Sequence, residues 1–294
     1  MCSKEKNGTR FAIRALPIGG LCAFHGEDEG VSDPECFNAQ PVWKRMIVVL
    51  AGPFMNILLA VVLAVIILMT YGEYMPMIND FTAENTPAEA AGIQVGDIIT
   101  EIDGKSITYY AECTDYIQQA DPARIEVTVR RDGMDVTLTA RDIYDPESGS
   151  NRLGIYISPE RLRYGLLEAA TNSVRYTCYI VKEMFKVLGG LFTGSVTSDD
   201  VAGPVGTISI IGQAVRAGFE VVLRLGVLIS INLGIMNILP IPALDGGRFL
   251  FMVIEAVRGK PIPPEKEGMI HMAGLVLLFS LMILLTVMDV RKLF

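Results

Sequence analysis

The sequence predicts a multi-pass α-helical membrane protein with an inserted α+β domain, and three observations support this prediction. Apolar residues make up 51% of the 294-residue chain, which is high for a protein that folds in water. Three long stretches carry no Asp, Glu, Lys or Arg: 46–72, 225–244 and 268–288. Between the first two stretches lies a segment whose apolar residues alternate with polar ones, as in β-strands.

The three apolar stretches are the expected membrane spans. A helix needs ~20 apolar residues to cross a bilayer, and the first stretch exceeds that length. We expect a transmembrane helix over 46–71, a transmembrane segment over 219–248 and a transmembrane helix over 268–289. The second span is interrupted by Pro240 and Pro242, which prevent a regular helix there.

The distribution of basic residues predicts the orientation. Lys44 and Arg45 precede the first span, and further Lys and Arg residues lie in the expected cytosolic loop over 249–267. Positively charged loops stay in the cytosol, so residues 1–45 are also expected there. The region between the first two spans is then extracytoplasmic.

Residues 75–160 are expected to form that extracytoplasmic domain. Two alternating runs, 124–131 and 134–140, are joined by Asp132-Gly133, a signal for a two-residue β-hairpin turn. Another strand is expected over 97–103, followed by a turn at Asp103-Gly104, and a helix over 109–120.

Residues 161–218 are expected to be an amphipathic membrane-associated helix with a connector. Charged residues interrupt the apolar ones too often over 164–192 for a spanning helix. A helix packed on the extracytoplasmic domain is the alternative, because an amphipathic pattern does not identify the partner of its apolar face.

The net charge of −8 and the lack of a basic tract argue against nucleic acid as a partner. The bilayer is the expected partner of the apolar spans.

Asp245 is the strongest candidate functional residue. It stands at the edge of an uncharged run, where a carboxylate is costly to bury, and it follows two prolines and precedes two glycines. A metal ligand on broken backbone fits this pattern, and so does a helix N-cap, since Asp is a good capping residue. His271, the only ionisable group of the third apolar stretch, is either a hydrogen-bonded interior residue or a ligand.

Several motifs together resemble the site-2 protease family of intramembrane zinc metalloproteases, in its bacterial branch with one PDZ domain. The resemblance covers nearly the whole chain, and its most specific part runs from Asn232 to Gly247. The motifs are Arg14-Ala-Leu-Pro-Ile-Gly-Gly20, Gly52-Pro53 with Asn56, Ala88-Glu-Ala-Ala-Gly92 with Gly96-Asp97-Ile98, Val201-Ala-Gly-Pro-Val-Gly206, and Asn237-Ile-Leu-Pro-Ile-Pro-Ala-Leu-Asp245-Gly-Gly247.

The resemblance implies zinc chemistry, with Asp245 as a zinc ligand. In the family, two further ligands and the general base come from a His-Glu-x-x-His motif on the first transmembrane helix. This chain has two histidines, His25 and His271, and neither begins such a motif. We therefore expect a family member that lacks its first ~40–60 residues, about one span and a short lead. This chain by itself is then expected to be inactive and not to bind zinc usefully.

The resemblance also implies how substrates are handled. Asn232, Asn237 and the backbone at Pro240 and Pro242 would hold an unwound substrate strand; for the two amides, interhelical hydrogen bonding is the alternative. A β-hairpin over 10–25 would offer an edge strand to substrate at the cytosolic membrane edge. The PDZ-like domain would bind substrates or act as a steric gate.

The expected partners are membrane proteins such as anti-sigma factors and signal-peptide remnants, and the expected location is the bacterial cytoplasmic membrane. The alternative is a noncatalytic, membrane-anchored PDZ binding module. The two differ in whether the DNA upstream of Met1 encodes His-Glu-x-x-His.

Overall fold

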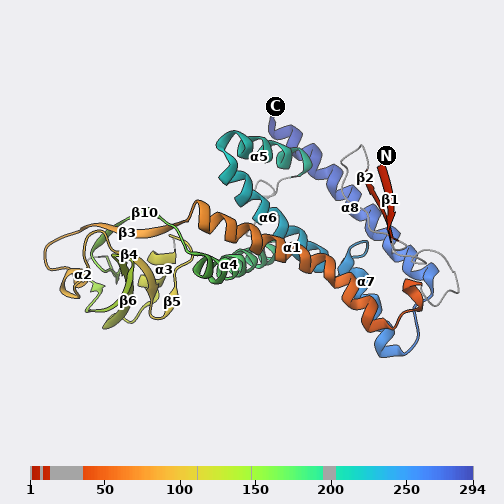
Figure 1. The fold of residues 1–294 in the computed structure, drawn as a ribbon. Helices are drawn as coiled ribbons and strands as arrows, with labels where there is room; N and C mark the ends of the chain where they lie inside the picture. The colour runs from red at the N-terminus through yellow and green to blue at the C-terminus, as the bar shows by residue number, and fades with distance from the viewer. Residues whose placement is uncertain are drawn as a thin grey trace.

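In the computed structural model, a β-rich domain lies at one end of the molecule and the long helices lie at the other (Figure 1). The structure describes residues 2–6, 9–13, 36–110, 112–146, 148–194 and 203–293. Three of the described helices are long and apolar enough to cross a membrane: α1 (Val42–Thr70), α6 (Phe219–Ile238) and most of α8 (Pro264–Leu293). The chain is thus a helical membrane protein with three candidate spans and an inserted β-rich domain.

The β-rich domain is built on one sheet with strand order β10-β3-β4-β6-β7, with β5 paired to β4. Every pairing along this order is antiparallel. The elements are β3 (Glu73–Phe81), α2 (Pro87–Ala90), β4 (Ile98–Ile102), β5 (Lys105–Ser106), α3 (Glu112–Gln119), β6 (Arg124–Arg131), β7 (Met134–Arg141), β8 (Tyr144–Asp145), β9 (Ser150–Asn151) and β10 (Ile155–Leu162).

The turns of this domain follow from residues that tolerate a left-handed backbone. Asp132 and Gly133 have φ of 51° and 80°, so the predicted hairpin between β6 and β7 is confirmed. Asp103 and Gly104, at 49° and 71°, make the predicted turn between β4 and β5. The predicted helix over 109–120 is present but shorter, as α3.

Apolar residues of β4 and β6 point into a closed core. Ile99, Ile125, Val127 and Val129 are 0% exposed, and α2 and α3 contribute Ala88 and Cys113 to the same core. Asp97, just before β4, is 2% exposed and forms a two-bond pair with Arg131, at 2.8 and 2.7 Å. The domain therefore has the closed core and paired buried charge of a unit that folds in water.

A second apolar core lies among three helices. Ala60, Ala64 and Ile67 of α1 pack with Val227 and Ile231 of α6. Helix α4 (Leu166–Thr193) adds Tyr176 and Ile180 to this cluster, so its buried face packs along α1 and α6. Packing along α1 and α6 was not expected, but α4 also contacts the β-rich domain, as one of the two alternatives had it. The rings of Tyr109 and Tyr176 stack 5.5 Å apart, and Arg130 Nη2 lies 3.4 Å from Glu168 Oε1.

Two segments differ from expectation. The N-terminal hairpin pairs β1 (Cys2–Lys6) with β2 (Thr9–Ile13), earlier than the expected 10–25, and 14–25 lie outside the described residues. The expected second segment, 219–248, ends its helix at Ile238, and a new helix, α7 (Asp245–Arg258), begins after a short loop. Residues 249–258 of the expected cytosolic loop are therefore helical.

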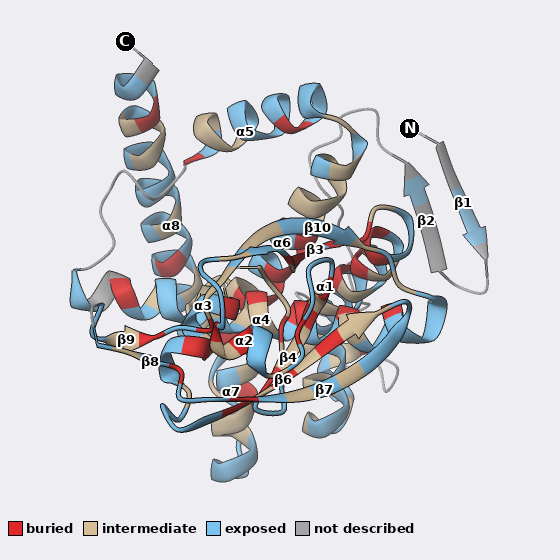
Figure 2. Ribbon diagram, turned by 90° about the vertical axis from the view of Figure 1, so that its left-hand side faces the viewer, coloured by how far each residue is buried: buried red, intermediate tan, exposed pale blue. Residues whose placement is uncertain are grey.

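Helices α5 (Pro204–Ala217) and α8 lie apart from the helical core, and most of their residues are exposed (Figure 2). The 6%-exposed Asp289 of α8 accepts hydrogen bonds from the backbone N–H groups of Gly203 (3.1 Å) and Gly206 (2.7 Å). These groups open α5, so a carboxylate satisfies donors that a helix start leaves unpaired. The remaining described element is the 3₁₀ turn η1 (Phe37–Ala39).

Candidate metal and substrate site

Asp245 is the first residue of α7 and follows the loop 239–244, which separates α7 from α6. The N-cap position of α7 is held by Leu244, which makes no side-chain capping bond. The helix-cap alternative for Asp245 is therefore wrong by one position. Its carboxylate instead stands in the first turn, where the partial positive charge of the helix start favours an anion.

The two glycines after Asp245 let the loop fold back on α7. A Cβ on Gly246 would lie 2.2 Å from the carbonyl oxygen of Leu239, and one on Gly247 would lie 2.4 Å from that of Ile241. No side chain fits at either distance. The Gly-Gly pair is therefore required by close packing of two backbones, which sets the direction in which Asp245 leaves the loop.

Asp245 lies beside helix α1, far away in sequence. A Cβ built on Gly52 would be 3.3 Å from Asp245 Oδ2. At the other end of α7, Arg45 Nη2 bonds Glu255 Oε1 at 2.6 Å, with both side chains largely buried. Helix α7 is thus held along the first half of α1, and two motifs of the sequence, Gly52-Pro53 and Asp245-Gly-Gly247, meet there.

The four residues expected to hold substrate lie on the second half of α6 and in the loop before Asp245, and they differ in exposure. Asn232 and Pro240 are exposed, whereas Asn237 and Pro242 are half-buried. Among the described residues, the side-chain amides of Asn232 and Asn237 make no hydrogen bond, so interhelical bonding, the alternative role for these amides, is not observed there. Asn232 is also off the buried stripe of α6, which contains Ile231, Gly234 and Ile235.

The described residues supply one candidate metal ligand here, Asp245, and no complete zinc site. Within the ranges given above, no group of three or more His, Cys, Asp or Glu side chains is placed to hold a metal. A catalytic zinc ion takes three protein ligands and an open position. Asp245 fits the role of one such ligand, and no catalytic step can be derived from it alone.

His271 of α8 contacts the loop before Asp245, and the sequence did not identify its partner in that loop. Its Nδ1 accepts a hydrogen bond from the backbone N–H of Ala243, at 2.9 Å. Of the two roles considered for it, the hydrogen-bonded interior residue is confirmed. No spacing rule links positions 243 and 271, because the loop and α8 meet only in the folded chain.

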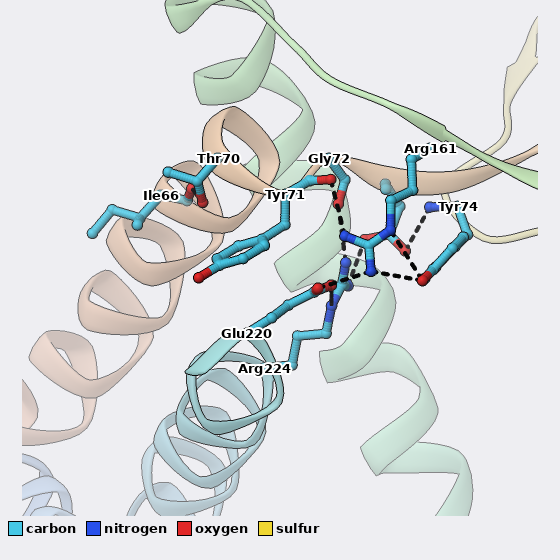
Figure 3. A network of polar contacts seen from close by, with 9 residues as sticks. Ile66, Thr70, Tyr71, Gly72, Tyr74, Arg161, Glu220 and Arg224 are labelled. Atoms are coloured by element: carbon cyan, nitrogen blue, oxygen red, sulfur yellow. Dashed lines mark hydrogen bonds and ion pairs between the residues drawn. The ribbon is translucent and has the colours of Figure 1, made fainter. Parts of the chain in front are cut away.

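Charged side chains join the β-rich domain to the N-terminal end of α6 (Figure 3). Arg224 Nη1 lies 2.7 Å from Glu73 Oε2 of β3, and Arg224 Nη2 donates to the carbonyl of Gly72 at 3.0 Å. Glu220 Oε1 accepts from Arg224 Nε at 3.1 Å, and Glu220 Oε2 lies 2.8 Å from Arg161 Nη2 of β10. Both strands that connect the domain to the helices are therefore tied to the helix that leads to Asp245.

These features define a helical membrane protein with an inserted β-rich domain and a carboxylate where α6 and α7 are separated by a loop. The chain belongs to peptidase family M50, whose family model matches residues 1–281. It is 37% identical over 262 residues to the zinc metalloprotease RasP of Shouchella clausii, covering 88% of this chain and 62% of that protein. It is 35% identical to the regulator of sigma-W protease RasP of Bacillus subtilis, covering 88% and 61%.

The chain thus spans about three fifths of the length of these two relatives. Among solved structures, the PDZ domain of an SdrC-like protein from Listeria innocua matches 31% of this chain and 99% of that domain, at 23% identity and a TM-score of 0.26.

Proposed function

We propose that this protein acts as an intramembrane zinc metalloprotease that cleaves transmembrane segments of membrane proteins, with Asp245 as one zinc ligand. Membership of family M50 supports the zinc and the reaction class. The observation that carries the proposal for this chain is Asp245 Oδ2 beside Gly52 of α1, in the first turn of α7 directly after the loop that contains Pro240 and Pro242.

The chain from Met1 to Phe294 contains no His-Glu-x-x-His, so the remaining ligands and the general base would have to come from residues outside it. When bound, zinc would supply Lewis-acid activation of water. On this proposal residues 1–294 alone neither bind zinc usefully nor cleave substrate.

Substrate would be held next to Asp245 by the loop 239–244 and the end of α6. A peptide in a membrane helix must unwind before hydrolysis, and its freed backbone groups need partners. The exposed Asn232 and the half-buried Asn237 have side-chain amides without hydrogen bonds among the described residues. We assign to these amides, and to the backbone at Pro240 and Pro242, the role of pairing with the unwound strand.

The PDZ-like domain would select substrates on the extracytoplasmic side of a bacterial cytoplasmic membrane. Strand β10 lies at one end of its sheet, where an added strand can pair. The hydroxyl of Tyr110 donates to the Ile157 carbonyl of β10 at 2.8 Å, so a strand that uses this carbonyl must displace Tyr110. Anti-sigma factors and signal-peptide remnants are the proposed substrates.

The test measures zinc content and cleavage of a single-span substrate for residues 1–294, for the same chain with its in-frame upstream sequence, and for the longer form carrying Asp245→Ala. We expect about one zinc per chain and cleavage only in the longer form with Asp245 intact. Asp135→Ala, which removes an exposed carboxylate, is the matched control and should keep both.

Absence of zinc and cleavage from every form would contradict the proposal and favour the noncatalytic PDZ binding module. Cleavage by purified residues 1–294 alone would contradict the assignment of missing ligands.

A further inference from the structure

The loop before Asp245 contains a backbone conformation that needs support from elsewhere. Ala243 has φ of +76°, in the left-handed region that non-glycine residues rarely adopt. Its N–H donates to His271 Nδ1 of α8, at 2.9 Å. A hydrogen bond from a distant helix therefore holds the strained residue two positions before Asp245.

The same imidazole also contacts the chain after Asp245. The ring of Phe251, in α7, meets the ring of His271 edge to face, with centroids 5.3 Å apart and planes 70° apart. Such aromatic contacts prefer this geometry over a stacked one. His271 thus touches the loop on one side of Asp245 and the helix on the other.

Helix α8 approaches this loop closely enough to exclude a side chain. Gly274 lies one turn after His271, and a Cβ built on it would be 2.5 Å from both Cβ and the carbonyl oxygen of Pro242. The backbone of α8 therefore rests directly on Pro242, and two consecutive turns of α8 hold two consecutive loop residues.

The hydrogen bond specifies the state of the imidazole. Because Ala243 N–H is the donor, Nδ1 carries no proton, and the neutral ring holds its proton on Nε2. Nε2 is buried, and it lies 3.7 Å from Glu267 Oε1, beyond hydrogen-bond length; in the described chain it has no hydrogen-bond partner. The Ala243 N–H is therefore the hydrogen-bonded partner of this ring.

We propose that His271 is a positioning residue for the Asp245 carboxylate, and that α8 braces the loop 239–244 through His271 and Gly274. The brace is anchored at its far end, where Asp289 accepts the N–H groups that open α5. Only 6% of the membrane-spanning stretch of α8 is buried, so α8 has no broad interface with the other helices. The contacts of His271, Gly274 and Asp289 hold it in place instead. The consequence for zinc binding rests on the proposed function; the positioning itself does not.

The two properties of His271 can be separated by substitution. His271→Phe keeps an aromatic ring against Phe251 but removes the acceptor, whereas His271→Asn keeps an acceptor close to the position of Nδ1 but removes the ring. Gly274→Ala forces α8 away from Pro242. Gly268→Ala is its matched control on the same helix, because nothing lies within 4 Å of a Cβ there.

The experiment is hydrogen exchange, read by mass spectrometry, on the full chain in lipid nanodiscs without metal. We expect the peptide covering 239–247 to exchange on the order of 3- to 10-fold faster in His271→Phe, as one lost hydrogen bond predicts. His271→Asn should restore much of the protection, Gly274→Ala should lose it, and Gly268→Ala should match the parent.

A second readout is specific to the hydrogen bond. The chain has two histidines, so ¹⁵N labelling of histidine and alanine gives two imidazole rings and also labels Ala243, and a His25→Gln variant identifies the signals of His271. We expect an unprotonated Nδ1, a protonated Nε2 and a coupling across the hydrogen bond to the ¹⁵N of Ala243.

Unchanged protection of 239–247 in His271→Phe would overturn the proposal. An equal loss of protection over all of α8 and α5 would also overturn it, because His271 would then only pack the helix. Neither readout needs zinc or cleavage, so the proposed function can fail while the positioning role stands, and the reverse. In a form that binds zinc, His271→Phe should weaken zinc binding about 10-fold, as the loss of supporting contacts around a metal ligand does.

Discussion

The β-rich domain and the helical region keep their shape by different means. In the domain, fully buried isoleucines and valines close a core around one sheet. The helical region has an apolar core among α1, α4 and α6, but many large apolar side chains stay exposed, and α7 and α8 are held through glycines, a few charges and one imidazole. Burial of apolar surface from water drives the first, whereas lipid removes that driving force between helices and leaves close packing and polar contacts to act.

The comparison has a functional consequence. A closed core resists local change, whereas a loop held by a small number of contacts can move when one of them is lost. The candidate site around Asp245 lies in the second kind of structure, and the junction of Arg224, Glu73, Glu220 and Arg161 links it to the first (Figure 3). Four predictions test this contrast.

The largest effect is expected in the domain core. Ile99 is 0% exposed, so Ile99→Ala should lower the free energy of unfolding of the domain by about 2–5 kcal/mol. The measurement is unfolding of the full chain in denaturant, with protease cleavage between residues 73 and 162 as the readout of the unfolded fraction of the domain. Val95→Ala, at a 56%-exposed position, should change little. A small effect of Ile99→Ala would mean that the domain lacks the tight core described above.

The next effect is expected where α1 and α6 cross. A Cβ on Gly234 would lie 2.9 Å from Ile57 Cδ1 and 3.2 Å from the Pro53 carbonyl oxygen, so in Gly234→Ala the Ile57 side chain must move and the backbone of α1 must shift slightly. We expect a loss of about 1–3 kcal/mol, measured as thermal stability in detergent. Gly212→Ala in α5 has open space and serves as the control. Equal stability of the two variants would show that close approach does not hold this crossing.

A somewhat smaller effect is expected at the junction. Arg224→Met would leave the carboxylate of Glu73, which is 5% exposed, without its partner, at a cost of about 1–2 kcal/mol. Because the domain core is untouched, the change should appear as faster proteolysis near 72 and 163 with unchanged unfolding of the domain. Arg124→Met, which breaks an exposed pair with Glu126, is the control. Loss of the domain fold in Arg224→Met would contradict a purely connecting role.

The smallest effect is a pH dependence within the domain. Burial raises the pKa of the Cys113 thiol from its ordinary 9.0 to about 12. The unfolded chain then loses this proton more easily, so stability present below the ordinary pKa is lost as pH rises towards 12. We expect a loss of about 1 kcal/mol between pH 8 and pH 10 that Cys113→Ala abolishes. The same pH slope in Cys113→Ala would assign the effect to other groups.

Some of this structure could be predicted because its signals are local. The turns at Asp132-Gly133 and Asp103-Gly104 follow from residues that tolerate positive φ, and the spans follow from the length of uncharged stretches. Asp245 stands out because a carboxylate beside an apolar run is costly. The end of α6 at Ile238, inside the expected segment 219–248, was missed, since element boundaries depend on contacts made later in folding.

The sequence by itself determined the class of protein, the inserted domain and the residue of the candidate site, because hydropathy, strand alternation and turn chemistry act over short distances along the chain. The tertiary structure alone decided that α4 packs along α1 and α6, that Asp245 lies beside Gly52, and that His271 holds Ala243. Each of these contacts joins residues separated by tens to hundreds of positions. Their pairing depends on how helices approach in space, which no local pattern records.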